Sequence, residues 1–268
     1  MSRPSNANSI AAVRLDRRRL IASGFGFAAS LAGSVLASAA PAPRQIIELL
    51  HRSRHGWPID LSGAALSEFD LTGIDFKSAK LARADFFGVN LTDATLAGAE
   101  LSGARLDRAV ITRTEFSSAN LEGASLLNIT VFTDLERNHR EAPRFAGARM
   151  AGAILSGFLD YSDFRWADMT AVRFGGATSL IGAKFAESQL QRVEFNGAAM
   201  TFGHFAGANL TDADLSGCEL SQADFSNANV TGMKVAGSDL HDAIFAGAIG
   251  VETIQGLDQA RNADRVRS

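Results

Sequence analysis

Apolar residues recur at every fifth position through most of this chain. Fifteen successive centres from 61 to 131 are Leu, Phe, Ile or Val, and fourteen centres from 180 to 245 are Leu, Phe, Met or Val. Seven more centres lie between 145 and 174, where the spacing loses one residue before Leu159 and regains it before Leu180. The residue two positions before each centre is small or apolar in most repeats, and no charged residue occupies either position from 59 to 131. These two positions therefore predict a buried ladder.

A period of five residues fits neither of the regular backbones. On an α-helix a step of five turns about 500°, so the centres would scatter around the cylinder. On a flat strand the same step moves each centre to the opposite face. The centres gather if the chain turns a corner every five residues, so that four steps close a square coil. Coils stacked about 4.8 Å apart would hydrogen-bond to one another, and the thirty-six centres predict about nine coils.

The order of residue types within each step adds a family resemblance. In AGANLTDADLSGCELSQADFSNANV, residues 206–230, a small residue precedes Asn, Asp or Glu, which precedes Leu, Phe or Val, and two variable residues follow. This pattern resembles the pentapeptide-repeat family, and dozens of steps in register make the resemblance specific. The resemblance implies an all-β solenoid, a right-handed quadrilateral β-helix, which we place at residues 59–250.

The segments on either side of the repeats predict caps for the open ends of the stack. Residues 40–58 form the expected N-terminal cap, since apolar residues within 44–55 are spaced for a short amphipathic helix. Residues 251–268 form the expected C-terminal cap or tail, closed by a short helix or by a partner and then frayed. Thirteen residues, 132–144, interrupt the register and predict a loop that is either a plain corner insertion or a recognition element.

The first thirty-nine residues have the pattern of an export signal. Arginines at 14 and 17–19 precede an uncharged stretch from 20 to 40, and Ala37-Ser38-Ala39 offers a small-x-small cleavage site. The run 16–22 resembles a twin-arginine signal. We therefore expect a periplasmic or secreted protein without stable membrane insertion after cleavage, and membrane anchoring through an uncleaved N-terminus is the alternative. Removing five Arg and one Asp leaves 21 basic and 28 acidic residues, a formal net charge of −7.

The residue types that carry chemistry do not converge in this sequence. Cys218 is the only cysteine and replaces Ala at an inward position. His51 and His55 are four residues apart on the expected cap helix, where a solvated face explains them better than a metal site. The many Asp and Asn residues before the centres are explained by local hydrogen bonds at the corners. We therefore expect no catalytic residue, no cofactor and no metal.

Partner contact is expected on the loop and on aromatic residues that point outward in this register. Outward aromatics that gather into a patch would mark an interface. The candidate contact residues are Phe87, Phe132, Arg137, His139, Arg140, Trp166 and Phe202. Phe158 is also outward. A homodimer through the C-terminal end is a further expectation.

The charge pattern distinguishes three candidate functions. The preferred one is a non-enzymatic, exported rod that serves as a structural or protein-interaction scaffold. If the N-terminus is not an export signal, the resemblance implies an alternative, protection of a type II topoisomerase (gyrase) by imitating DNA, which requires a dense acidic face. The outward residues of the first run give each of the four sides a net charge of only −1, for example three acidic and two basic residues on the first side. A cell-wall enzyme would need converging carboxylates, and no nucleic-acid partner is expected.

Overall fold

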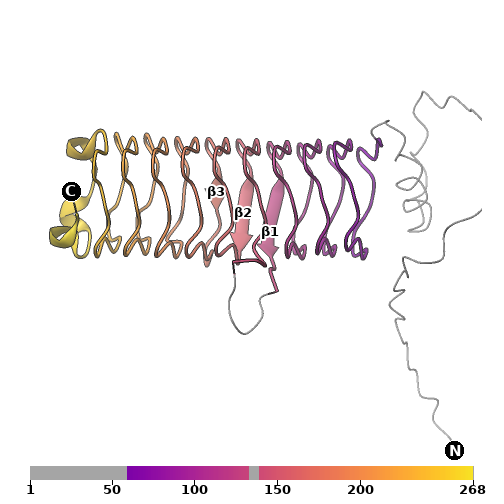
Figure 1. The fold of residues 1–268 in the computed structure, drawn as a ribbon, viewed down its shortest axis with the longest axis horizontal. Helices are drawn as coiled ribbons and strands as arrows, with labels where there is room; N and C mark the ends of the chain where they lie inside the picture. The colour runs from indigo at the N-terminus through magenta and orange to yellow at the C-terminus, as the bar shows by residue number, and fades with distance from the viewer. Residues whose placement is uncertain (1–58, 133–138, 268) are drawn as a thin grey trace, which may run out of the picture. The chain divides into compact units, whose positions relative to one another are not determined.

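Four-sided coils build the repeat region of this protein. The computed structural model describes residues 59–132 and 139–267, and the coils stack along one axis (Figure 1). The predicted export segment, 1–39, and the predicted N-terminal cap, 40–58, lie outside the described residues. Within the described residues, no helix is long and apolar enough to cross a membrane.

Parallel backbone bridges connect residues one coil apart. Asp60 pairs with Lys80, Lys80 with Glu100, and Glu100 with Asn120, so each coil contains twenty residues in this part. We name the sides by their first centres, so that sides one to four begin at Leu61, at 66, at 71 and at 76. All centres from 61 to 126 and from 145 to 245 are buried, and Val131 is half-buried. The predicted five-residue step is therefore confirmed for these residues.

The corners explain the polar part of the repeat. At the first corner Ala64 N donates to Leu61 O (3.0 Å), and Gly63 between them has φ 69°, as at the third residue of a type II turn. The residue before the centre fixes the same turn, since Asp60 Oδ1 accepts from Ser62 N at 3.1 Å. Equivalent bonds recur along the solenoid, which confirms the local role expected for Asp and Asn.

A stack of phenylalanine rings fills side four. Six successive ring pairs are nearly parallel, with centroids 4.8–5.1 Å apart. The ladder consists of Phe116, Phe145, Phe164, Phe185, Phe205, Phe225 and Phe245. The coil spacing sets this separation, because each ring repeats one coil above the last.

Three irregular steps separate the two long registers. Glu115 pairs with Arg144, 29 residues later, so this coil contains 29 − 20 = 9 extra residues at the corner between sides three and four. The next coil is one residue short and the following one is one residue long, since Arg144 pairs with Asp163 and Asp163 with Lys184. The parallel strands β1 (Ser125–Ile129), β2 (Ile154–Gly157) and β3 (Arg173–Phe174) lie side by side at this place, in the order β1-β2-β3 (Figure 1).

The C-terminal segment continues the solenoid with longer steps. Three short 3-10 helices, η2 (Val251–Thr253), η3 (Leu257–Gln259) and η4 (Ala263–Arg265), occupy the corners of this last turn (Figure 1). Bridges join 234 to 255, 239 to 261 and 244 to 267, so each step has six residues. The expectation that this segment frays is wrong, because its backbone pairs with the preceding coil as far as residue 267.

Candidate protein-interaction surface

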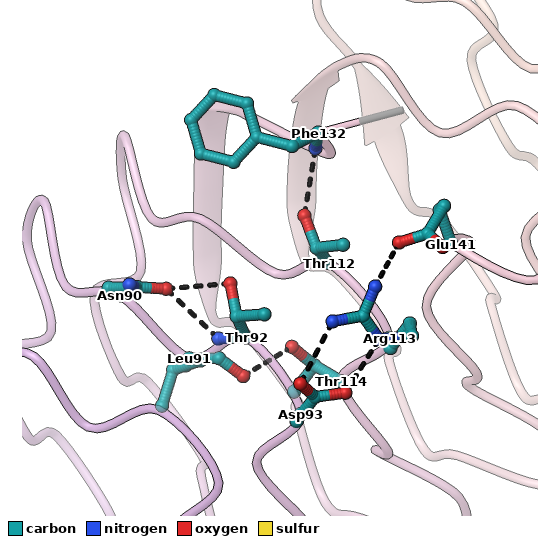
Figure 2. Close-up of polar contacts among 9 residues, drawn as sticks. All are labelled: Asn90, Leu91, Thr92, Asp93, Thr112, Arg113, Thr114, Phe132 and Glu141. Atoms are coloured by element: carbon teal, nitrogen blue, oxygen red, sulfur yellow. Dashed lines mark hydrogen bonds and ion pairs between the residues drawn. The ribbon is translucent and has the colours of Figure 1, made fainter. Parts of the chain in front are cut away.

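Arg113 anchors the exit of the 132–144 loop to the side-three corner. Its backbone N donates to Glu141 O (2.9 Å), and its guanidinium also pairs with the Glu141 carboxylate. The same guanidinium donates to both oxygens of Asp93, from Nε at 2.6 Å and from Nη2 at 2.8 Å (Figure 2). These bonds from Arg113 lower the pKa of Asp93, and the pKa of Arg113 is raised in turn. Arg113 thus connects the loop to its own coil and to the preceding coil, which carries Asp93.

The hydroxyl of Thr112 fixes the entrance of the same loop, and that of Thr114 binds to the coil beneath it. Thr112 is buried, and its Oγ1 accepts a hydrogen bond from Phe132 N (2.7 Å), the last described residue before the loop tip (Figure 2). Thr114 Oγ1 donates to Leu91 O (2.9 Å), which holds the underlying corner. On the far side, Arg144 Nε donates to Glu115 Oε2 (2.6 Å). Both ends of the loop are therefore held on the solenoid.

Aromatic side chains gather on side three, next to this loop. Phe132 and Phe158 are each 63% exposed, and Phe202 is 50% exposed at the following corner. All three belong to side three, because Phe158 pairs with Ser179 and Ser179 with Ala199 in its ladder, while Phe132 and Phe202 follow side-three centres. We define the side-three face as the outward residues around the side-three centres from 111 to 220: Val110, Arg113, Thr130, Phe132, Phe158, Asp160, Tyr161, Ser179, Ile181, Ala199, Thr201, Phe202, Glu219, Ser221 and Gln222. The middle of this face combines Phe132, Phe158, Tyr161 and Ile181 with the polar Thr130, Asp160 and Ser179.

Tyr161 lies flat on the neighbouring coil of the same face. A Cβ at Gly182 would lie 2.6 Å from Tyr161 Cε1, so the ring occupies the space that this glycine leaves. On its other side, the Tyr161 ring meets His139 edge to face, with centroids 6.0 Å apart. His139 thereby belongs to the edge of the side-three face.

The remaining predicted contact residues lie elsewhere. Phe87 is half-buried under the guanidinium of Arg105, 4.4 Å from its ring centroid, so it is less available than the register predicts. Trp166 is 55% exposed at the corner after side four, where its Nε1 donates to Glu187 Oε2 (3.1 Å). Arg140 is exposed on the loop, and Arg137 lies outside the described residues.

The predicted set contained only Phe132 and Phe202 of the side-three face, and the large apolar or aromatic members that it lacked include Phe158, Tyr161 and Ile181. Phe158 is outward in the sequence register, but its neighbours depend on the shortened step that precedes Leu159. Tyr161 could have been found from the sequence through Gly182. This glycine has the same corner position one coil later and leaves room for the ring.

Opposite charges meet between neighbouring coils in several ladders, although Glu194 pairs with Asp214 and Glu219 pairs with Asp239. On side four the ladder runs Glu115, Arg144, Asp163 and Lys184, and on side two Asp214 pairs with Lys234. Each carboxylate in these ladders has a cation one coil away. This arrangement provides no dense acidic stripe of the kind that DNA imitation requires.

The titratable residues form no reactive group among the described coils. Burial raises the pKa of the Cys218 thiol to about 12, which keeps it protonated. No cluster of three or more His, Cys, Asp or Glu in the described part of the chain could hold a metal ion. His204 and His241 lie on separate sides, in the side-four and side-three repeats.

Five-residue steps, square coils and parallel ladders define a quadrilateral β-solenoid. The family model "Pentapeptide repeats" matches residues 59–93, 90–126, 204–242 and 223–249, with eight copies. These stretches are pentapeptide repeats, whose fold is the right-handed quadrilateral β-helix, so the predicted resemblance is confirmed there. No curated protein sequence matches the chain significantly.

Solved structures of pentapeptide-repeat proteins resemble this chain. HetL, involved in heterocyst differentiation regulation in the cyanobacterium Nostoc sp. strain PCC 7120, is 25% identical, with a TM-score of 0.59 over 83% of this chain and 97% of HetL. A trypsin-treated variant of QnrB1, a plasmid-mediated fluoroquinolone resistance protein, is 18% identical, with a TM-score of 0.29 over 75% of this chain and 92% of that one. A protein from the thylakoid lumen of Arabidopsis thaliana is 28% identical, with a TM-score of 0.23 over 44% and 66%.

Proposed function

We propose that this chain is an exported, non-enzymatic scaffold of about nine coils that binds a protein partner through the side-three face. The observation that carries the proposal is the set of exposed phenylalanines on a surface whose coils are connected by backbone hydrogen bonds. A partner that covers this surface would bury the side chains of Phe132, Phe158 and Phe202. No contact within the fold would be lost when they are covered.

Several features of the surface favour protein binding over the two alternatives. The backbone groups along the sides are paired between coils, so a partner must be recognised by side chains. A topoisomerase-protecting DNA mimic needs concentrated negative charge, whereas the side-four ladder interleaves Glu115 and Asp163 with Arg144 and Lys184. A cell-wall enzyme needs a cleft with converging carboxylates, and the carboxylates before the centres bond to their own corners.

Affinity capture tests the contact surface. Wild-type protein, Phe158→Asp and Trp166→Asp would each be immobilised and exposed to an extract of the compartment in which the protein resides. We expect Phe158→Asp to lose the captured partner and Trp166→Asp to retain it, because Trp166 lies on a different corner. Equal capture by all three proteins would reject the side-three face.

Cell fractionation with N-terminal sequencing tests the export part of the proposal. We expect a periplasmic or secreted chain that begins at Ala40, after the small-x-small site. An intact chain held in the membrane would support the anchored alternative. An intact cytoplasmic chain would remove export from the proposal, and a drug-protection assay on topoisomerase would then test the second alternative.

A further inference from the structure

We propose that the partner presents an α-helix that lies parallel to the solenoid axis, on a stripe of apolar side chains along one corner. This helix carries a lysine or arginine one turn beyond its apolar residues. The inference rests on the proposed function, since it states the chemistry of the partner that the side-three face binds. It commits to a helical segment of another protein and not to an extended one.

The corner between sides three and four carries one large apolar or aromatic side chain in each of four successive coils. We call these residues the corner stripe: Phe132, Tyr161, Ile181 and Phe202. The first is 63% exposed and the last 50%, and the two between them are half-buried. Ile129 pairs with Gly157, which places the first two coils next to one another. The side-three ladder then continues from Phe158 through Ser179 to Ala199, so the stripe runs along the solenoid axis.

The backbone at the corner stripe is already hydrogen-bonded to the next coil. Tyr161 N donates to Ile181 O (2.8 Å), and Phe202 N donates to Ser221 O (3.0 Å). A partner strand therefore finds no sheet edge here, and its own N–H and C=O groups would lie unpaired over apolar side chains. A helix pairs these groups within itself. The surface therefore favours a helical partner.

The spacing of the coils also matches a helix. Rings one coil apart in the phenylalanine stack on side four are 4.8–5.1 Å apart, and one turn of an α-helix rises about 5.4 Å. A helix parallel to the axis therefore places about one turn over each coil, and its apolar residues three or four positions apart meet successive members of the corner stripe. In an extended segment the side chains on one face are about 6.6 Å apart, which matches the coils less well.

Carboxylates flank the corner in the coil that follows Phe202. Glu219 precedes this corner and Asp224 follows it, on sides three and four. Glu219 is exposed, and its neighbours in the ladder, Ala199 and Asp239, supply no cation. A helix that continues one turn past Phe202 brings its next side chain toward these carboxylates. A lysine or arginine is therefore favoured at that position.

Photocrosslinking of the captured partner tests the helix. p-Benzoylphenylalanine would replace Phe132 or Phe202, three coils apart, and the crosslinked residues of the captured protein would be located by mass spectrometry. Three coils measure about 14 Å, so a helix predicts crosslinks about ten residues apart in one segment, whereas an extended segment predicts about four. The same replacement at Trp166, on a different corner, should not crosslink this segment. Crosslinks about four residues apart, or in unconnected segments, would overturn the helix.

A phage library of random 16-residue peptides tests the charge. We expect wild-type bait to select peptides with apolar residues three or four positions apart and a Lys or Arg one turn beyond one end of this pattern. Glu219→Lys bait should select Asp or Glu at that position. Glu194→Lys is the matched control, because it reverses an exposed carboxylate on side two and should select the wild-type pattern. The same basic residue with all three baits, or peptides without the apolar spacing, would contradict the inference.

The outcomes separate this inference from the proposed function. If wild type captures a protein that Phe158→Asp loses, but the crosslinks do not have helical spacing, the scaffold function stands and the helix is wrong. If Phe158→Asp captures the same protein as wild type, the side-three face is rejected and the inference falls with it.

Discussion

Individual inward positions determine how well each step of the solenoid packs. Most positions two before a centre hold Ala, because only a few atoms fit between the centre and the next corner. Ser162 occupies one of these positions on side four, and its hydroxyl is fully buried without a hydrogen-bond partner. Ser238, at the corresponding position on side three, donates to Leu215 O at 2.7 Å. The same residue type thus has opposite effects at two equivalent places.

Replacing these two serines should change stability in opposite directions. Ser162→Ala should raise the free energy of unfolding by about 1 kcal/mol, because it removes an unsatisfied buried hydroxyl. Ser238→Ala should lower it by about 1 kcal/mol, because it leaves the Leu215 carbonyl without this donor. Urea denaturation followed by circular dichroism measures both. A Ser162→Ala protein less stable than the wild type would contradict the interpretation.

At the scale of the element, the shortened step is permitted by one glycine. Gly157 has φ 121° and ends β2, where Ile129 of β1 pairs with it. A Cβ at Gly157 would overlap the carbonyl oxygen of Ile129. The step before Leu159 can therefore be one residue shorter only because the backbones of β1 and β2 come into contact at Gly157. This approach also places Phe158 on the side-three face.

Gly157→Ala should consequently destabilise the solenoid more than an ordinary corner substitution. We expect a loss on the order of 3 kcal/mol or more, from steric overlap and left-handed strain together. Gly152→Ala is the matched control, because its φ is 67° but no atom lies within 4 Å of a Cβ there, so it should cost about 1 kcal/mol. Thermal unfolding compares the two. Equal losses would show that contact with Ile129 does not matter.

At the scale of the whole molecule, hydrogen bonds to carboxylates recur along the stack and connect its stability to pH. Hydrogen bonds from Ser62 lower the pKa of Asp60, and a hydrogen bond from Asn262 lowers that of Asp239. At Asp163 burial acts in the opposite direction, and hydrogen bonds from Arg165 outweigh it, so its pKa is also lowered. These groups are spread from the first described coil to the last.

The stability of the solenoid should therefore fall in acid. A carboxyl group whose pKa is lower in the folded state stabilises the fold above its unfolded pKa of about 4, and this contribution is lost as the pH falls through the folded pKa. We expect the free energy of unfolding to change little from pH 7 to 5 and to decrease below about pH 4. Denaturation curves at several pH values measure this. A free energy that stays constant down to pH 2 would contradict the expectation.

The sequence by itself determined the solenoid, because its five-residue period is a local property of the chain. Leu101, Phe116, Leu215 and Phe225 were assigned to the interior from spacing alone, and all four are buried. The hydrogen bonds that close each corner join residues two or three apart, so they too could be predicted. Gly at many corner positions follows from the same local requirement, because φ is positive there.

The tertiary structure decided which outward residues meet. Residues that are neighbours on a face are about twenty positions apart, and each insertion or deletion changes that number, to 29, 19 and 21 in the middle of the chain. The grouping of Phe132, Phe158 and Phe202, and the contact of His139 with Tyr161, depend on these offsets. The pairing of Gln255, Arg261 and Arg267 with the last regular coil depends on a change from five-residue to six-residue steps. Local pattern could not reveal these contacts, because stacking between coils creates them.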